Sequence, residues 1–348
     1  MIEIIGLNRK SLESELSKLG EKSFRAKQIW QWLYFRGVKN FDEMTNLSKD
    51  FRENLKKHFT LTRPKIITEQ RSEDETRKWL LEFSDGQRVE TVFIPEEDRG
   101  AVCVSSQVGC AMGCSFCNTG TQKIIRNLTP AEIIGQVMIA KDACDDWAKV
   151  DGRAVSNIVV MGMGEPLLNM ENMVQALNIF TDPDGFAFSR RKITLSTVGI
   201  APNIIPLIKA TGVKLAISLH APNDDIRQKI MPVTKKYPME ELLKACQEYQ
   251  KCDGSRHITF EYLMLKGIND KLEYARELVS LMKKYKLGAK VNLIAFNPWS
   301  GCGFESSPRK YIEAFASEIR KGDFEAPIRA SRGQDILAAC GQLKSSIA

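Results

Sequence analysis

Residues 101–117 read AVCVSSQVGCAMGCSFC, a short apolar run followed by a loop that gathers three cysteines. The run is typical of a buried strand. Cys110, Cys114 and Cys117 then follow with three and two residues between them, which is a metal-type spacing. Glycines surround these cysteines, and their small size lets a loop wrap closely around a bound group. The stretch therefore predicts a thiolate site at the end of a strand.

The spacing alone leaves two kinds of metal site open. Thiolates are the usual ligands of iron–sulfur clusters. Three of them would hold three irons of a [4Fe–4S] cubane and leave the fourth iron free for another ligand. A structural zinc ion needs four protein ligands, and Cys103 is the nearest candidate for the fourth.

From about residue 99 onward, apolar runs alternate with helical stretches. One helix has a clear start, because Thr129, Pro130 and Glu132 supply an N-cap, a first-turn proline and a capping box. Strand–helix alternation predicts an α/β fold with a parallel sheet, and six runs indicate a partial, six-stranded β/α barrel. The runs are residues 101–106, 157–162, 192–197, 214–219, 258–265 and 290–296.

The chain ahead of the barrel divides into two parts. Residues 1–60 predict a helical accessory domain, because Leu12, Leu16 and Leu19 recur at helical spacing. Basic residues lie between the apolar ones, so this domain is a candidate RNA-docking unit. Residues 61–98 contain three short extended runs and a hairpin signal, which predict an antiparallel β connector. Residues 99–348 then form the barrel and a C-terminal tail.

Polar residues and glycines stand at the ends of the predicted strands, where ligands bind in barrels of parallel strands. A carboxylate such as that of Glu165 suits a ligand that carries an ammonium group. These strand-end residues are Gly164 and Glu165 after the second run, Ser196 in the third, Ser218 and His220 at the fourth, and Asn297 after the sixth.

The cysteine loop, with Phe116 before its last cysteine, resembles the radical S-adenosylmethionine (SAM) superfamily, as does GMGEP at 162–166. This resemblance implies a [4Fe–4S] cluster on Cys110, Cys114 and Cys117, whose open iron chelates SAM. Reduction of the cluster then yields a 5′-deoxyadenosyl radical. The same likeness implies further SAM contacts from strand-end residues, namely Gly164, Glu165, Ser196, Ser218, Leu219, His220 and Asn297.

Three further segments resemble the RlmN/Cfr family of RNA adenosine methyltransferases. They are RVETVFIPE with Glu90, CVSSQVGC with Cys103, and the terminal CGQL with Cys340, and the likeness covers nearly the whole chain. It implies that two SAM molecules are used per turnover: one methylates Cys340, and the other yields the radical that activates this methyl group. Cys103 would then release the product through a transient disulfide with Cys340, and Glu90 would act as the base.

The chemistry explains why a radical is needed. Carbon 2 of adenine is electron-poor and its C–H bond is not acidic, so it offers no electron pair to the methyl group of SAM. The resemblance implies 23S rRNA, in the peptidyl-transferase loop, and tRNA, 3′ of the anticodon, as substrates. Such enzymes act on unpaired or extruded bases. It also leaves a carbon-8 methyltransferase of the Cfr type as the alternative.

Composition and charge limit the class of protein. Hydrophobic residues make up 43% of the 348 residues, and no apolar run reaches the length of a membrane span. No signal peptide precedes the first helix, so we expect a cytoplasmic protein without membrane contact. The nine cysteines are an odd number, unlike a secreted disulfide framework.

The net charge of +7 is compatible with RNA. Basic stretches at 123–126 and 190–192 are candidate phosphate contacts. We further expect a monomer that receives electrons from a flavodoxin-type protein. The alternative from another functional class is a non-catalytic, zinc-bearing RNA-binding protein.

Overall fold

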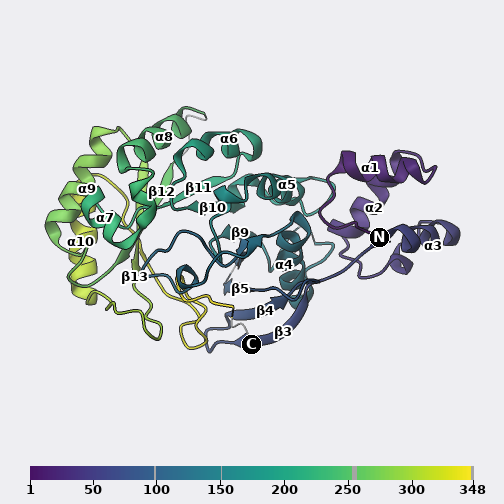
Figure 1. Ribbon diagram of the computed structural model, residues 1–348, viewed down its shortest axis with the longest axis horizontal. Coiled ribbons are helices and arrows are strands. Elements are labelled where there is room, and N and C mark those ends of the chain that lie inside the picture. Colours follow the sequence, from purple (N-terminus) through teal and green to yellow (C-terminus); the bar gives the residue numbers. More distant parts are fainter. Residues whose placement is uncertain (98, 150, 253–256, 346–348) are drawn as a thin grey trace.

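The computed structural model describes residues 1–97, 99–149, 151–252 and 257–345 (Figure 1). The chain begins with a helical lobe, drawn at the right of Figure 1, in which two short strands pair in parallel. Its elements are β1 (Ile2–Glu3), α1 (Arg9–Lys18), α2 (Phe24–Tyr34), η1 (Phe41–Glu43), α3 (Lys49–His58) and β2 (Phe59–Thr60).

The lobe is joined to the rest of the molecule by a buried aromatic cluster and by ion pairs. The Arg9 guanidinium of α1 donates to Asp182 at 2.7 and 2.6 Å and to Asp184 at 2.8 Å. Both aspartates follow the end of α5, so the contact connects residues that are more than 170 positions apart. The helices predicted for residues 1–60 are therefore present, and they pack on the second half of the chain.

A ten-stranded sheet forms the centre of the molecule, with the strand order β14-β13-β12-β11-β10-β9-β6-β5-β4-β3. Its parallel part contains all six predicted strands, which confirms the α/β fold with a partial barrel. The parallel strands are β6 (Arg99–Cys103), β9 (Asn157–Val160), β10 (Ile193–Thr197), β11 (Lys214–Ser218), β12 (Ile258–Met264), β13 (Ala289–Ala295) and β14 (Ile328–Arg329).

The short strand β14 was not predicted, because two residues are too few to show a periodic pattern. It pairs in parallel with β13 and extends the barrel edge.

Among the described residues, no helix combines the length and the apolar character needed to cross a bilayer. Helices connect and cover the parallel strands, namely α4 (Pro130–Ala143), α5 (Met170–Thr181), α6 (Ala201–Thr211), α7 (Asp224–Ile230), α8 (Met239–Lys251), α9 (Leu272–Lys284) and α10 (Arg309–Lys321).

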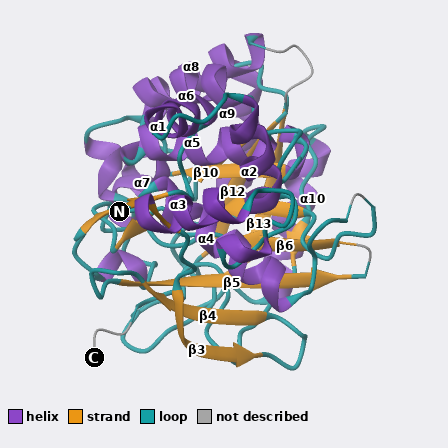
Figure 2. Ribbon diagram, turned by 90° about the vertical axis from the view of Figure 1, so that its right-hand side faces the viewer, coloured by secondary structure: helices purple, strands orange, loops and turns teal. Residues whose placement is uncertain are grey.

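The predicted β connector is part of the same sheet. Strands β3 (Lys65–Arg71), β4 (Arg77–Glu82) and β5 (Arg88–Glu96) are antiparallel, and β5 pairs with β6 to continue the barrel (Figure 2). Hydrogen bonding between β5 and β6 thus joins the antiparallel strands to the parallel part of the sheet. The remaining short elements are β7 (Gln107–Val108), η2 (Thr119–Thr121), β8 (Arg126–Asn127), η3 (Pro166–Leu168), η4 (Arg190–Lys192) and η5 (Pro232–Lys235).

The first parallel strand ends earlier than predicted. Strand β6 stops at Cys103, because Ser105 and Ser106 make loop contacts instead of continuing the ladder. The Ser105 hydroxyl donates to the Glu90 carbonyl at 2.7 Å, and the Ser106 amide donates to the Met163 carbonyl at 2.8 Å. This turn directs the following cysteine loop across the carboxyl ends of the strands.

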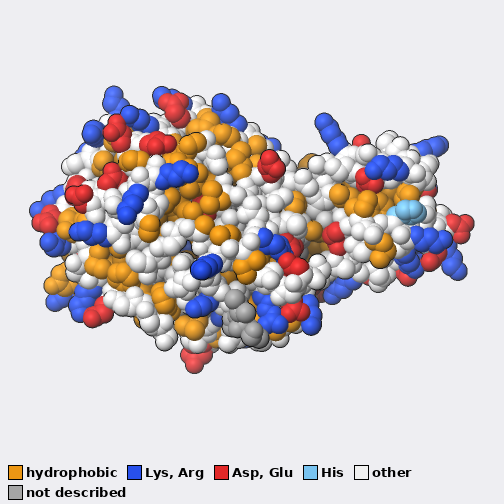
Figure 3. All heavy atoms as spheres, in the orientation of Figure 1, with side chains coloured by type: hydrophobic (Ala, Val, Ile, Leu, Met, Phe, Trp, Pro, Cys, Tyr) orange, Lys and Arg blue, Asp and Glu red, His pale blue; other side chains and the backbone are white. Residues whose placement is uncertain are grey.

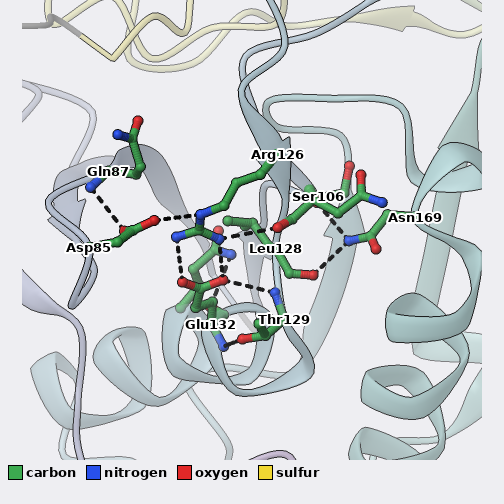
Figure 4. Close-up of polar contacts among 10 residues, drawn as sticks. Asp85, Gln87, Ser106, Arg126, Leu128, Thr129, Glu132 and Asn169 are labelled. Atoms are coloured by element: carbon green, nitrogen blue, oxygen red, sulfur yellow. Dashed lines mark hydrogen bonds and ion pairs between the residues drawn. The ribbon is translucent and has the colours of Figure 1, made fainter.

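The predicted capping box at the start of α4 is confirmed. Thr129 accepts from the Glu132 amide, and Glu132 accepts from the Thr129 amide at 2.8 Å. Arg126 donates to both carboxylate oxygens of Glu132 at 2.8 Å and to Asp85 in the β4–β5 turn at 2.6 Å (Figure 4). Arg126 is therefore engaged within the protein, which removes it from the predicted phosphate contacts at 123–126.

Candidate active site

A cavity of about 160 Å³ lies at the carboxyl ends of the parallel strands. Residues from the cysteine loop, from five parallel strands and from the C-terminal tail line it together. Of the residues predicted for the site, the cavity is lined by Cys110, Cys114, Cys117, Gly164, Glu165, Ser196, Ser218, His220 and Cys340. A second, more open cavity of about 630 Å³ lies between the helical lobe and α5, and none of these residues lines it.

The cysteine loop is compact because a glycine allows the chain to close on itself. The Gly120 amide donates to the Cys117 carbonyl at 3.0 Å, and the Cys117 amide donates to the Cys114 carbonyl at 3.1 Å. A Cβ atom on Gly120 would lie 2.7 Å from the Cys114 carbonyl oxygen. A larger residue at position 120 would therefore push the loop apart and move the thiols.

Burial raises the pKa of all three loop thiols, that of Cys110 to about 11 and that of Cys114 well above its ordinary value. The pKa of Cys117 is also raised, chiefly by burial. Buried thiols ionise when a bound metal stabilises the thiolate. Within the described ranges, no three His, Cys, Asp or Glu side chains lie in an arrangement ready for a single metal ion.

A buried cation lies beside this loop. The Arg227 side chain of α7 is fully buried, and it donates to the carbonyls of Leu219, Val198 and Ser218 at 3.1, 2.6 and 3.1 Å. Burial lowers its pKa to about 10, and the largest opposing influence is the Cys114 thiol. A buried positive charge next to three thiols fits an anionic, thiolate-ligated group in the cavity.

Glu165 is buried and its carboxylate is held by three donors. Oε1 accepts from the Thr197 hydroxyl at 2.7 Å and from the Leu167 amide at 3.0 Å. Oε2 accepts from the Val198 amide at 2.9 Å. Burial raises the Glu165 pKa to about 7 despite these bonds. A fixed carboxylate at the end of β9 thus faces the cavity, as the sequence predicted, and it also holds the end of β10.

His220 has a single tautomer in this environment. Its Nδ1 accepts from the Leu263 amide at 3.0 Å, so the ring proton is on Nε2. Burial, and secondarily the charge of Arg227, lowers the His220 pKa to about 3, so the ring is neutral. Phe116 packs against the ring edge-to-face at a centroid distance of 4.9 Å. The site therefore offers one neutral N–H donor here.

The other predicted SAM contacts differ in position. Ser196 and Ser218 lie side by side, with their hydroxyl oxygens 3.5 Å apart on neighbouring strands. Leu219 and Asn297 are buried but do not line the cavity. Asn297 instead accepts from the Gln334 amide group of the tail at 2.6 Å.

The C-terminal tail closes the cavity by binding to the cysteine loop. The Asn118 amide donates to the Gly341 carbonyl at 2.7 Å, and the Thr119 hydroxyl donates to the Leu343 carbonyl at 2.6 Å. Protein atoms surround Cys340 on most sides, but part of its side chain remains accessible. This accessible part lines the cavity. The tail thus brings a thiol from the end of the chain to the site.

Cys340 lies close enough to Cys103 to affect the Cys103 thiol electrostatically. Burial raises the Cys103 pKa to about 12, and Cys340 adds to this shift. Both residues are free thiols, as are the other described cysteines, so the structure does not show the transient disulfide that the family resemblance implies. Cys103 does not line the cavity and is the last residue of β6.

Glu90 is buried on β5 and is bound on both of its carboxylate oxygens. Lys78 Nζ lies 3.0 Å from Oε1, and the Lys344 amide donates to Oε2 at 2.8 Å. Burial raises the Glu90 pKa, and the charge of Lys78 opposes the shift. A carboxylate with a raised pKa is a plausible proton acceptor near neutral pH.

Comparison with known proteins agrees with this geometry. The family described as "Ribosomal RNA large subunit methyltransferase N-terminal domain" matches residues 2–61, and the radical SAM superfamily matches residues 104–279. A "Dual-specificity RNA methyltransferase RlmN" of Rhodopseudomonas palustris (strain BisB5) is 51% identical, over 98% of this chain and 89% of that protein. Its counterpart from Rhodospirillum rubrum is 52% identical, over 99% of this chain and 80% of that protein.

The chain belongs to the RlmN family of radical SAM methyltransferases. A solved structure titled as a radical SAM methyltransferase from Sphaerobacter thermophilus covers 99% of this RlmN-family chain, with a TM-score of 0.93 and 40% identity. The superfamily uses SAM and a [4Fe–4S] cluster. The buried thiols and the buried Arg227 fit such a cluster. Because the chain belongs to a family of enzymes, the alternative of a non-catalytic, zinc-bearing RNA-binding protein is excluded.

Sequence reasoning missed three charged residues of the site in this RlmN-family chain. Glu261 on β12 lines the cavity and influences Cys340 electrostatically, while Lys78 and Arg227 are buried next to predicted residues. A signal was present for Glu261, which is the single charge in an apolar strand sequence, whereas Lys78 follows Arg77 in a strand that also contains Glu82. Arg227 lies in a polar helix and gave no such signal.

Proposed function

We propose that this chain methylates carbon 2 of adenosine in 23S rRNA, at the peptidyl-transferase loop, and in tRNA, 3′ of the anticodon. The observation that carries the proposal is the position of Cys340. The tail brings this thiol into a cavity lined by the three-cysteine loop and next to the second thiol, Cys103. The names of the relatives favour carbon 2 over the carbon-8 alternative.

The cysteine loop would hold the [4Fe–4S] cluster, with Cys110, Cys114 and Cys117 as ligands. When bound and reduced, the cluster with SAM supplies a 5′-deoxyadenosyl radical that takes a hydrogen atom from an S-methyl group. Glu165 would accept from the SAM ammonium group, while Ser196, Ser218 and the Nε2–H of His220 would bind polar groups of the same molecule. Leu219 and Asn297 would support this site from behind the cavity wall.

Cys340 would carry the methyl carbon through the reaction. Its thiol loses a proton and takes a methyl group from a first SAM. After hydrogen-atom loss to the radical from a second SAM, the S–CH2 carbon bonds to carbon 2 of the base. The adduct would return one electron to the cluster, which forming the radical would have left oxidised, and Glu90 would take the proton from carbon 2, which restores the aromatic ring.

Cys103 would then release the product. Its thiolate attacks the sulfur of Cys340, the S–CH2 bond breaks, and the departing carbanion takes up a proton to become the methyl group. Cys103 and Cys340 are left as a disulfide, which a two-electron thiol reductant returns to the free thiols seen in the structure. Two SAM molecules are consumed in each turnover.

The helical lobe and the basic surface residues would bind the RNA. On the face shown in Figure 3, Lys and Arg side chains are spread over both lobes among acidic ones. The segment 190–192 is mostly exposed at the start of β10, as expected for a phosphate contact. We propose a division into residues 1–60 for RNA docking, 61–98 for Glu90, and 99–348 for the barrel and tail. A cytoplasmic monomer that is reduced by a flavodoxin-type protein completes the proposal.

The test is product analysis. The protein is reconstituted with iron and sulfide without oxygen, then incubated with SAM, a reductant and either a 23S rRNA fragment or a tRNA transcript. Mass spectrometry of the digested RNA should show 2-methyladenosine. 8-Methyladenosine would overturn the choice of carbon, and the absence of any methylated adenosine with iron-loaded protein would overturn the proposed function.

A further inference from the structure

Lys78, Glu90 and Cys103 lie on neighbouring strands and share one face of the sheet, opposite to α4. Leu80 pairs with Glu90 and Val92 pairs with Cys103, so the side chains of Glu90 and Cys103 point to the same side as those of Leu80 and Lys78. Thr91 points to the other side, where its hydroxyl donates to Gln136 of α4. The tail covers the face of Glu90.

The pair of Lys78 and Glu90 holds the tail on both sides of Cys340. Lys78 Nζ donates to the Leu337 carbonyl at 3.3 Å, and Glu90 Oε2 accepts from the Lys344 amide at 2.8 Å. The two charged groups are 3.0 Å apart, and the side chains of Lys78 and Glu90 are 8% and 9% exposed. The segment 337–344 is thus anchored at each end by one member of a buried ion pair.

One anchor point is held in a strained conformation. Leu337 has a φ of +53°, in the left-handed region that a leucine rarely adopts. Its side chain is exposed, so packing of the side chain does not account for this conformation. The hydrogen bond from Lys78 to its carbonyl is therefore one of the contacts that keep the segment bent. Loss of this contact would favour a different path of the tail.

We propose that Lys78 and Glu90 act as a proton-sensitive clasp, in which uptake of a proton by Glu90 loosens segment 337–344 and frees Cys340 to move. An ionised carboxylate accepts hydrogen bonds about twice as strong as those of a neutral group, so neutral Glu90 would hold the Lys344 amide and Lys78 weakly. The mechanistic consequence rests on the proposed function. There, the proton that Glu90 takes from carbon 2 would itself release the tail for the attack by Cys103.

Among the described residues, the groups that face Glu90 come from β4, from the tail and from β6. Lys78 approaches from β4, the Lys344 amide from the tail, and Cys103 shares the face from β6. Burial is the main cause that raises the Glu90 pKa, and Lys78 limits the rise. The clasp should therefore hold when Glu90 is ionised and loosen as the pH falls through its titration. Lys78 is a positioning residue, because it acts through Glu90 and the tail.

Hydrogen–deuterium exchange of the reconstituted full-length protein tests the clasp without RNA or turnover. Glu90→Gln keeps the shape of the side chain and removes its charge, while Lys78→Met removes the opposite charge. Peptides that cover 337–344 should exchange about tenfold faster or more in both variants, a change of about 1.4 kcal/mol in local opening. Peptides of β9, β10 and β11 should be unchanged.

Lys65 and Glu82 provide matched controls on the same sheet. They form a cross-strand pair at 3.4 Å between β3 and β4, but Lys65 is exposed. Lys65→Met and Glu82→Gln should leave the exchange of 337–344 as in the wild type. Equal protection of 337–344 in Glu90→Gln and wild type would overturn the clasp.

A measurement on the unmodified protein decides the same question if the variants fold poorly. Exchange of 337–344, corrected for intrinsic chemical exchange, is followed between pH 8 and pH 5. Protection should fall as the pH falls, while protection of β10 stays constant. A flat profile would contradict the proton-sensitive clasp. Because no methyl transfer is measured, a failure here is distinct from a failure to make methylated RNA.

Discussion

The guanidinium of Arg227 donates to the carbonyl of Val198 at 2.6 Å. Val198 directly follows strand β10 and lines the cavity. In the described part of the chain, Arg227 forms no salt bridge, and its other bonds go to two carbonyls and the Thr234 hydroxyl. A fully buried charge without a carboxylate partner is costly. The natural counter-charge is therefore the thiolate-ligated group that the adjacent loop would bind.

We predict that Arg227→Met lowers the reduction potential of the reconstituted cluster. Removal of a buried positive charge disfavours the reduced, more negative form, and the expected shift is on the order of tens of millivolts. A redox titration followed by electron paramagnetic resonance measures it. Arg227→Lys, which keeps the charge, should restore most of the shift, and Arg191→Met on the exposed η4 should show none. A potential unchanged in Arg227→Met would contradict this role.

Glu165→Gln should destabilise the protein. The wild-type carboxylate accepts from two amides and one hydroxyl, whereas the glutamine would direct its NH2 group at one of these donors. A buried donor without an acceptor costs about 1–3 kcal/mol. Urea unfolding of the protein without cofactors measures the change. Glu13→Gln, at an exposed position of α1, should have no comparable effect. Equal stability of the two variants would contradict the prediction.

His220 should make the stability fall in acid. Its pKa is lowered to about 3 in the folded protein, so the unfolded chain binds more protons between about pH 6.5 and pH 3. The folded state should lose up to about 1.4 kcal/mol per pH unit relative to His220→Asn as the pH falls in this window. Urea unfolding at several pH values compares both proteins. His58→Asn, at an exposed position of α3, should keep the wild-type slope, and a parallel slope in His220→Asn would refute the assignment.

Cys340→Ala should make no methylated RNA and carry no methyl group on the protein. The sulfur that accepts the first methyl group is absent, and no other thiol takes its place at the tail. Mass spectrometry of the tail peptide after incubation with SAM measures the protein methyl group. Cys252→Ala, at the exposed end of α8, should behave like the wild type. Methylated RNA from Cys340→Ala would exclude Cys340 as the methyl carrier.

Cys103→Ala should trap the RNA on the protein. The carbon bond to the base forms as usual, but no thiolate attacks the Cys340 sulfur, so the S–CH2 bond stays intact. A shifted band that disappears on RNase treatment, with loss of free product, would show the adduct. The double variant Cys103→Ala, Cys340→Ala should form none. Free methylated RNA at the wild-type yield would contradict the role of Cys103.

Local patterns explain why so much of the fold was predictable. The apolar runs that became β9 to β13 follow from residues that are neighbours in sequence, as does the Thr129–Glu132 capping box. The cysteine loop is equally local, since its three thiols lie within eight residues. Strand β14 and the union of the connector with the barrel were not predictable in this way. They depend on backbone hydrogen bonds between distant segments.

The sequence by itself determined the types of the elements and the spacing of the cysteines, and it predicted which residues would carry the chemistry. Hydrophobic periodicity and short motifs encode these features, because both act over a few residues. The tertiary structure alone decided that the tail places Cys340 beside the cysteine loop and that Lys78 and Glu90 hold this tail. It also decided that Arg227 is buried with carbonyl and hydroxyl groups as its hydrogen-bond partners among the described residues. Each of these depends on contacts across up to about 260 residues, which only packing and burial select.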